Sequence, residues 1–68
     1  MSETLRNIIA DNLLRLRKEQ NISQAKLAKL SGVSLGFIKG LEAKRHNPSI
    51  ETLEKIAKAL RVDVKDLL

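Results

Sequence analysis

The stretch QAKLAKLSGVSLGFIKGL, residues 24–41, decides the fold, because it predicts two short amphipathic helices that meet at a glycine. Ala28 lies four residues before Gly32, and Ile38 lies six residues after it. Two helices that cross steeply over a tight turn need a small side chain where they touch, which Ala28 provides. They also need a corner residue that tolerates positive φ, which Gly32 provides. The second helix would then stand out from the domain and could enter a DNA major groove.

Three stretches within residues 9–68 carry a wider pattern: LRKEQNISQAKLAKLSGVS, FIKGLE and NPSIETLEKIAKALRVDVKDLL. Together they resemble the helix-turn-helix domain of the phage Cro and lambdoid repressor family, also called the xenobiotic-response-element type. The resemblance implies an all-α fold, a compact five-helix globule of the lambda-repressor-like type. It also implies sequence-specific binding to double-stranded DNA, usually as a symmetric dimer.

Length and composition allow one small domain, residues 1–68, with a core of aliphatic side chains. The chain has 68 residues, no cysteine and one aromatic residue, Phe37. Thirteen Lys and Arg against eight Asp and Glu give a net charge of +5, which suits nucleic acid, although solvated surface lysines would give the same charge. No membrane-spanning run and no signal-peptide pattern is present in the sequence, which predicts a cytoplasmic protein, bacterial or phage-encoded.

Apolar periodicity and capping residues predict the positions of the helices. An apolar stripe at helical spacing indicates the first helix, and Ser23, Ser34 and Ser49 are expected N-caps of the next three. Asp63, with Asp66 three residues later, predicts an approximate capping box for a last short helix. The expected helices are residues 4–20, a helix from residue 24, residues 34–43, residues 49–60 and a short helix from residue 63.

The helix over about residues 34–43 would be the recognition helix, but it offers few groups that can read bases. Lys39 is its one side chain able to donate to guanine O6 or N7, and Leu35 can pack on a thymine methyl. Gly36 and Gly40 share one bare face, which would let the backbone approach DNA closely and make DNA shape important. The alternative is a surface whose specificity has been lost or has moved to a protein partner. The residues expected to face bases are Ser34, Leu35, Gly36, Lys39 and Gly40.

A second group of residues is expected at the phosphate backbone. The resemblance places a phosphate at Gln24, where free amides and the positive end of the helix dipole support it. The loop of residues 44–47 corresponds to a family loop that follows the backbone, although a solvated charge run is the alternative. His46 is not expected to bind metal or to act as a base, since no cysteine and no second histidine accompany it. The expected phosphate contacts are Arg17, Gln24, Phe37, Lys44, Arg45 and Asn47.

Two of these residues have a further expected property. Phe37 can anchor the recognition helix to the core, with its edge available to DNA. Lys44 stands where relatives generally have the C-cap glycine. A backbone that stays left-handed there would cost roughly 1 kcal/mol, which a reshaped loop would avoid.

Arg17 and Glu42 are expected to form a structural pair. In the family, the matching arginine of the first helix reaches the glutamate that closes the recognition helix and orients that helix. Two unrelated surface charges are the alternative, worth about 0–1 kcal/mol if they meet.

The chain ends on apolar residues that need a partner. Part of this segment must pack against the first and fourth helices, and the rest is a candidate two-fold interface. A cut inside a longer repressor would leave the same ending. The candidate dimer residues are Val64, Leu67 and Leu68.

These observations predict a transcriptional regulator, and in particular a repressor, that binds a palindromic operator without cofactor, metal, small-molecule ligand or catalysis. No nucleophile, base and orienting group can be assembled from one histidine and scattered serines. An antitoxin or a restriction-modification controller on the same fold is one alternative. A protein-interaction adaptor that uses the face of the recognition helix is another, and weak dependence of binding on salt would distinguish it.

Overall fold

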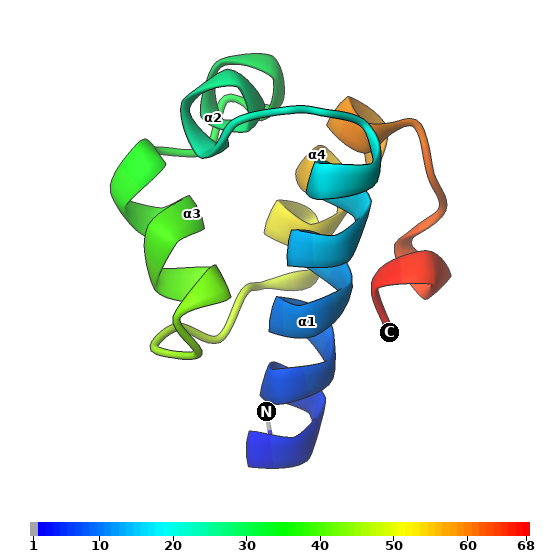
Figure 1. Ribbon diagram of the computed structural model, residues 1–68. Coiled ribbons are helices and arrows are strands. Elements are labelled where there is room, and N and C mark those ends of the chain that lie inside the picture. Colours follow the sequence, from blue (N-terminus) through cyan, green and yellow to red (C-terminus); the bar gives the residue numbers. More distant parts are fainter. Residues whose placement is uncertain (1) are drawn as a thin grey trace.

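Four α-helices and a final 3-10 turn surround a single core in the computed structural model, which describes residues 2–68. In Figure 1, α2 lies at the top above α3, α3 forms the left edge, and the C-terminal turn lies on the side of α1 opposite to α3. Among residues 2–68, no helix is both long enough and apolar enough to cross a membrane. The elements are α1 Glu3–Glu19, α2 Gln24–Ser31, α3 Leu35–Glu42, α4 Ile50–Leu60 and η1 Val64–Leu67.

The expectation of five helices is wrong for the last element, which is a 3-10 turn. Only four residues, Val64–Leu67, are helical there, and its backbone bonds link residues three apart. So short a segment cannot complete more than about a turn of α-helix, and 3-10 helices typically have this length. The expected contact between Asp63 and Asp66 is present, because the Asp66 carboxylate accepts from the Asp63 N–H at 3.0 Å.

Serine caps begin all four α-helices. The hydroxyls of Ser23, Ser34 and Ser49 each accept from the amide three residues later, at 3.0–3.2 Å, as expected. Ser2 does the same for α1, at 3.1 Å, which moves the start of that helix one residue before the expected position. Each such cap contributes about 1 kcal/mol. The helices can therefore begin sharply after short connections.

Left-handed residues follow the ends of the helices and turn the chain. Gly32 has φ of +74° after α2, whereas Asn21, Lys44 and Arg61 have φ of 56°, 63° and 57°. After α3, the Lys44 N–H donates to Leu41 O and the Arg45 N–H to Gly40 O, a Schellman motif. The backbone at Lys44 thus keeps the left-handed geometry and its strain, so the loop is not reshaped.

The core is aliphatic and closed. Among residues 2–68, no polar or charged residue is buried. The C-terminal segment joins the core through Leu67, and the Asn12 side-chain amide donates to Leu67 O at 3.1 Å. The largest fully buried side chains are Ile9, Leu13, Leu27, Ile38, Leu41, Leu53, Ile56, Leu60 and Leu67.

The expectation that Leu67 lies in a dimer interface is wrong. Its side chain is 1% exposed, because η1 turns it onto α1 and α4, where it completes the core. Leu68, by contrast, is 49% exposed, and Val64 is half-buried against the core. Only these two of the three candidates retain surface that a second copy could cover.

Replacing Lys44 by glycine tests the left-handed position. Glycine relieves roughly 1 kcal/mol of strain, partly offset by its greater freedom in the unfolded chain, so Lys44→Gly should stabilise the fold by about 0.5 kcal/mol. Urea unfolding followed by far-ultraviolet circular dichroism measures this change. Lys58→Gly, on the exposed side of α4, is the matched control and should cost about 1 kcal/mol. Equal losses in the two variants would contradict the interpretation.

Candidate nucleic-acid interface

The joint between α2 and α3 has the geometry that the sequence predicts. The Gly32 N–H donates to Ala28 O at 3.0 Å, and the left-handed φ of Gly32 directs the chain into α3. Ser31 supports the turn, since its hydroxyl accepts from the Val33 N–H at 3.2 Å. A Cβ at Gly32 would meet no atom of the described residues within 4 Å, so glycine is needed there for its φ rather than for space. This turn sets the crossing of the two helices.

α3 lies at the edge of the molecule and is covered on one side (Figure 1). Ile38 and Leu41 are buried beneath it, with 0% and 1% of their surfaces exposed. Ser34, Gly36 and Lys39 are exposed on its other side. An outward helix face beside a tight turn is the arrangement with which helix-turn-helix proteins read a major groove.

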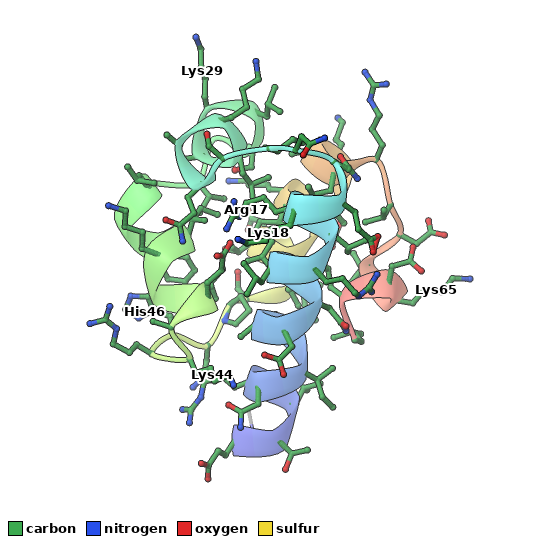
Figure 2. The ribbon with its side chains drawn as sticks, in the orientation of Figure 1. Arg17, Lys18, Lys29, Lys44, His46 and Lys65 are labelled. Atoms are coloured by element: carbon green, nitrogen blue, oxygen red, sulfur yellow. The ribbon has the colours of Figure 1, made fainter. Side chains whose placement is uncertain are left out.

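The Glu42 carboxylate, at the end of α3, ties that helix to α1. Arg17 on α1 donates from Nε to Glu42 Oε2 at 2.7 Å and from Nη2 to Glu42 Oε1 at 2.9 Å. Its Nη1 donates to Ile22 O at 2.8 Å. The Arg17 and Glu42 side chains are 11% and 8% exposed, and the hydrogen bond to Glu42 raises the pKa of the Arg17 guanidinium above its ordinary value. In Figure 2, Arg17 lies between α1 and α3, so this bidentate pair fixes the end of α3.

Gln24 is turned toward the same carboxylate. Its side-chain amide donates to Glu42 Oε1 at 3.0 Å, so that group points inward in the free protein. The prediction of a phosphate contact did not anticipate this bond. A carboxylate has lone pairs for about four donors and can accept from both Arg17 and Gln24. What α2 presents outward is its N-terminus, with the positive end of its dipole.

The two glycines of α3 lie in different surroundings. A Cβ at Gly36 would meet no atom of the described residues within 4 Å, and Gly36 is exposed. Gly40 is buried, and a Cβ there would overlap the ring of His46. The prediction that Gly40 faces bases is therefore wrong, because a side chain of the following loop covers it.

His46 also meets Phe37, and sequence reasoning missed this role. The two rings stack with their centroids 4.9 Å apart and their planes 7° from parallel. Phe37 thus packs half-buried between the core and His46, which leaves less of it for the phosphate contact that was expected. The sequence does hold a signal, since a helical glycine costs roughly 0.5–1 kcal/mol and needs compensation. A stacked aromatic pair can supply a similar amount.

The loop after α3 carries exposed cations beside the recognition helix. Lys44, Arg45, His46 and Asn47 are all exposed, and Figure 2 shows His46 beside the lower end of α3 and Lys44 below it. Lys44 Nζ lies 3.5 Å from Asp11 Oδ1 on α1, but both side chains are well exposed, so this pair contributes little. The predicted phosphate contacts therefore separate into Arg17 and Gln24, which are turned inward, and an outward loop.

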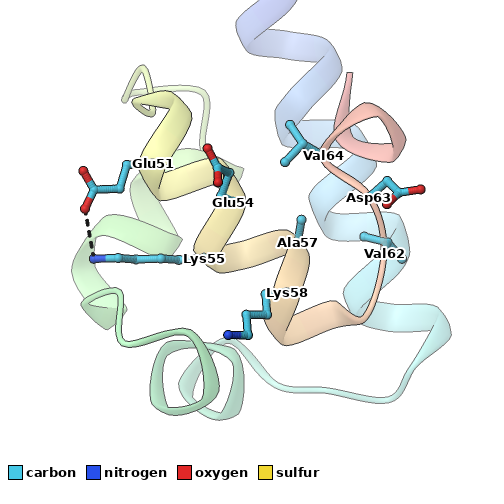
Figure 3. Close-up of a pocket in the computed structure, with 8 residues that line it drawn as sticks. All are labelled: Glu51, Glu54, Lys55, Ala57, Lys58, Val62, Asp63 and Val64. Carbon is cyan, nitrogen blue, oxygen red and sulfur yellow. Dashed lines mark ion pairs between the residues drawn. The ribbon is translucent and has the colours of Figure 1, made fainter.

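A shallow hollow lies away from α3. It has a volume of about 510 Å³ and is formed by α4 and the segment before η1 (Figure 3). Its lining holds both carboxylates and ammonium groups, and Lys55 pairs with Glu51 at 3.9 Å. No cluster of three or more His, Cys, Asp or Glu side chains in residues 2–68 could hold a metal ion. The lining residues are Glu51, Glu54, Lys55, Ala57, Lys58, Val62, Asp63 and Val64.

Comparison with known proteins agrees with this geometry. The family model described as Helix-turn-helix, HTH_3, matches residues 13–67. The chain is 38% identical over 64 residues to control protein C.SmaI from Serratia marcescens, a match covering 94% of this chain and 76% of that protein. It is 32% identical over 60 residues to the immunity repressor protein of Bacillus phage phi105, covering 88% of this chain and 42% of that protein.

A solved structure extends the comparison. The restriction-modification controller protein C.AhdI from Aeromonas hydrophila superimposes with a TM-score of 0.89 at 30% sequence identity, covering 93% of this chain and 96% of that chain. The turn between α2 and α3 and the outward face of α3 define a helix-turn-helix protein. The chain belongs to the HTH_3 family, and its relatives identify it as a DNA-binding transcriptional regulator of the phage-repressor type.

Removal of the Glu42 carboxylate tests how much the fold depends on it. Glu42→Ala leaves the Arg17 guanidinium largely buried without its counter-charge, so we expect a loss of about 3 kcal/mol. Urea unfolding at low temperature measures the loss. Glu19→Ala, which removes the exposed pair with Arg15, is the control and should cost about 0–1 kcal/mol. Equal losses would show that the pair at Glu42 carries no special weight.

Proposed function

We propose that this regulator binds a palindromic operator as a two-fold dimer, places α3 in the major groove of each half-site, and represses transcription without catalysing a reaction. The observation that carries the proposal is the outward face of α3, held in place by the turn at Gly32 and by the Arg17–Glu42 pair. Binding to DNA would place its action in the cytoplasm of a bacterium. The whole of residues 1–68 would serve as one DNA-binding domain.

Base contacts would come from the first turns of α3. Lys39 is exposed and can donate to guanine, and Leu35 is half-buried with a methyl edge available for thymine. Ser34 caps α3 by accepting from Phe37 N–H, which leaves its hydroxyl hydrogen free to donate. The bare face at Gly36 lets this part of the helix lie close to the groove floor. Since Lys39 is the one long polar side chain in this set, DNA shape would supply much of the specificity.

Phosphate contacts would come from two places that flank α3. Arg45 and Asn47 lie in the exposed loop after it, with Lys44 beside them. On the other flank, the N-terminus of α2 presents free amides and the positive end of its dipole, next to Gln24. Arg17 would act mainly through Glu42, by orienting α3. Contacts on both flanks would hold the helix in register on the duplex.

A second copy would cover the surface near the C-terminus. Leu68 is exposed there, and Ile8 is exposed on α1, the helix against which η1 packs. Two copies related by a dyad would place their α3 helices about 34 Å apart, one helical turn of DNA. Half-site spacing would then follow from the dimer geometry.

A controller of a restriction-modification system is the second candidate function. The likeness to the restriction-modification controller C.AhdI and to control protein C.SmaI favours it. A controller would bind DNA with the same surface of the protein. The two candidates differ in the gene that is regulated, and selection of bound fragments from the source genome identifies that gene.

Duplex binding at increasing salt tests the proposed function. Affinity should fall steeply as salt rises, because each neutralised phosphate contributes a slope of about 0.9 in a log–log plot. Footprinting of the selected fragments should show two half-sites about one helical turn apart. Affinity that is insensitive to salt would favour a protein-interaction adaptor that uses the face of α3.

Lys39 and Arg45 should differ in how they contribute to binding. Lys39→Ala should relax the preference at one or two positions of each half-site, with a loss of discrimination of roughly 1–3 kcal/mol. Arg45→Ala should weaken all sequences alike and lower the salt slope by about one. Binding to a library of operator variants, measured at two salt concentrations, separates these effects. The assignment fails if the two variants change specificity in the same way.

Leu68→Glu tests the dimer surface. A carboxylate there would oppose burial of this position against a second copy, so the variant should sediment as a monomer at concentrations where the parent is a dimer. Analytical ultracentrifugation measures the shift. Leu30→Glu, which changes an exposed leucine on α2 at another part of the surface, is the matched control and should leave the dimer intact. A dimer that persists in Leu68→Glu would place the interface elsewhere.

A further inference from the structure

The loop after α3 is attached to that helix at two points. At the first, the Lys44 N–H donates to Leu41 O at 3.1 Å and the Arg45 N–H donates to Gly40 O at 2.8 Å. At the second, the ring of His46 lies back over Gly40 and stacks on Phe37. Arg45 takes part in the first attachment through its N–H, and the next residue, His46, makes the second. The backbone of Arg45 is therefore held on both sides, while its side chain is exposed.

The second attachment depends on the absence of a side chain at Gly40. A Cβ there would overlap two ring atoms of His46 and lie 3.1 Å from Cγ. Four residues earlier on the same helix, a Cβ at Gly36 would meet nothing within 4 Å among the described residues. The φ of Gly40 is not in the left-handed region, so its backbone does not require glycine. Space for the His46 ring is thus the structural reason for glycine at this position.

The stack also has a favourable geometry. The rings of Phe37 and His46 are 7° from parallel with centroids 4.9 Å apart, within the range of a favourable stacked pair. Phe37 is itself packed against the core, so it serves as a firm platform. Beyond His46, the chain passes through exposed Asn47 into buried Pro48 and on to α4. The loop therefore has little freedom to move relative to α3.

We propose that Gly40, Phe37 and His46 form a clasp that holds the loop of residues 44–47 so that Arg45 and Asn47 meet the DNA phosphate backbone. His46 is then a positioning residue, which acts through the loop rather than through its own charge. The inference rests on the proposed DNA binding, and it adds that the phosphate contacts of the loop require the stacked rings. Because the ring covers α3 at Gly40, base contacts are confined to the part of α3 before that residue, and the loop takes over beyond it.

Nuclear magnetic resonance of the free protein tests the clasp itself. The parent should show ring-to-ring nuclear Overhauser effects between Phe37 and His46, and ring-current shifts of the His46 signals. Gly40→Ala should abolish both, whereas Gly36→Ala, the matched control, should leave both unchanged. Absence of these effects in the parent, or their persistence in Gly40→Ala, would overturn the clasp. This experiment needs no DNA, so it tests the clasp even if the proposed function is refuted.

Binding to a random-sequence DNA duplex tests what the clasp does. His46→Ala should lower the salt slope by about one and the affinity roughly tenfold near 0.1 M salt, as expected for one lost phosphate contact. Gly40→Ala should do the same, and the double variant should be no worse than either. His46→Phe keeps a stacking ring without a titratable group and should restore parental binding.

Three outcomes would overturn the positioning role. In the first, His46→Ala binds like the parent, and the loop needs no clasp. In the second, His46→Phe binds as weakly as His46→Ala, which would show that the imidazole itself contacts DNA. In the third, the losses of Gly40→Ala and His46→Ala add in the double variant, which would show that the two residues act separately. Thermal melts of each variant show whether the fold is intact. A parent that binds no duplex would instead refute the proposed function.

Discussion

The carboxylate of Glu42 is the point at which the three helices that build the DNA-binding surface are tied together. Arg17 reaches it from α1 and Gln24 from the start of α2, while Glu42 itself closes α3. An aliphatic core tolerates small rotations of a packed helix, because its contacts have no direction. A bidentate guanidinium–carboxylate pair does not, because two parallel hydrogen bonds fix distance and angle together. The orientation of α3 is therefore set by this largely buried charge pair together with the hydrophobic contacts beneath it.

Much of the scaffold could be predicted from the sequence, because local signals decide it. A serine hydroxyl caps the helix that follows it whatever the tertiary structure, so Ser23, Ser34 and Ser49 placed three helix starts correctly. The joint at Gly32 was equally clear, since few residues tolerate its φ. Ile38 and Leu41 lie three residues apart on one face of α3, and both are buried, as helical periodicity of apolar residues requires. These features involve neighbours within a turn or two of chain.

The features that could not be predicted depend on which side chain covers a surface. Gly40 looked bare by helical periodicity, and only the folded loop brings His46 over it. Gln24 looked free at its helix start, but Glu42 has a lone pair left for it. Leu67 looked like an exposed ending, yet the 3-10 turn points it into the core. For Gly40 and Gln24, the missing information was a contact with a residue outside the local helical pattern. For Leu67, it was the change from an α-helix to a 3-10 turn.

The outward face of α3 is largely uncoupled from the scaffold, and this affects how such a regulator can change during evolution. Gly36 and Lys39 are exposed and take no part in the core, so new side chains there could alter operator choice with little effect on folding. Positions 37, 40 and 46 have no such freedom. A side chain at position 40 would displace the His46 ring, and the stacked pair needs a ring at both 37 and 46. A lineage could thus retarget this protein to new promoters by exchanging exposed residues of α3, such as Gly36 and Lys39, while Phe37 stays in place. Divergence at the three coupled positions would require simultaneous substitutions, which arise far more rarely.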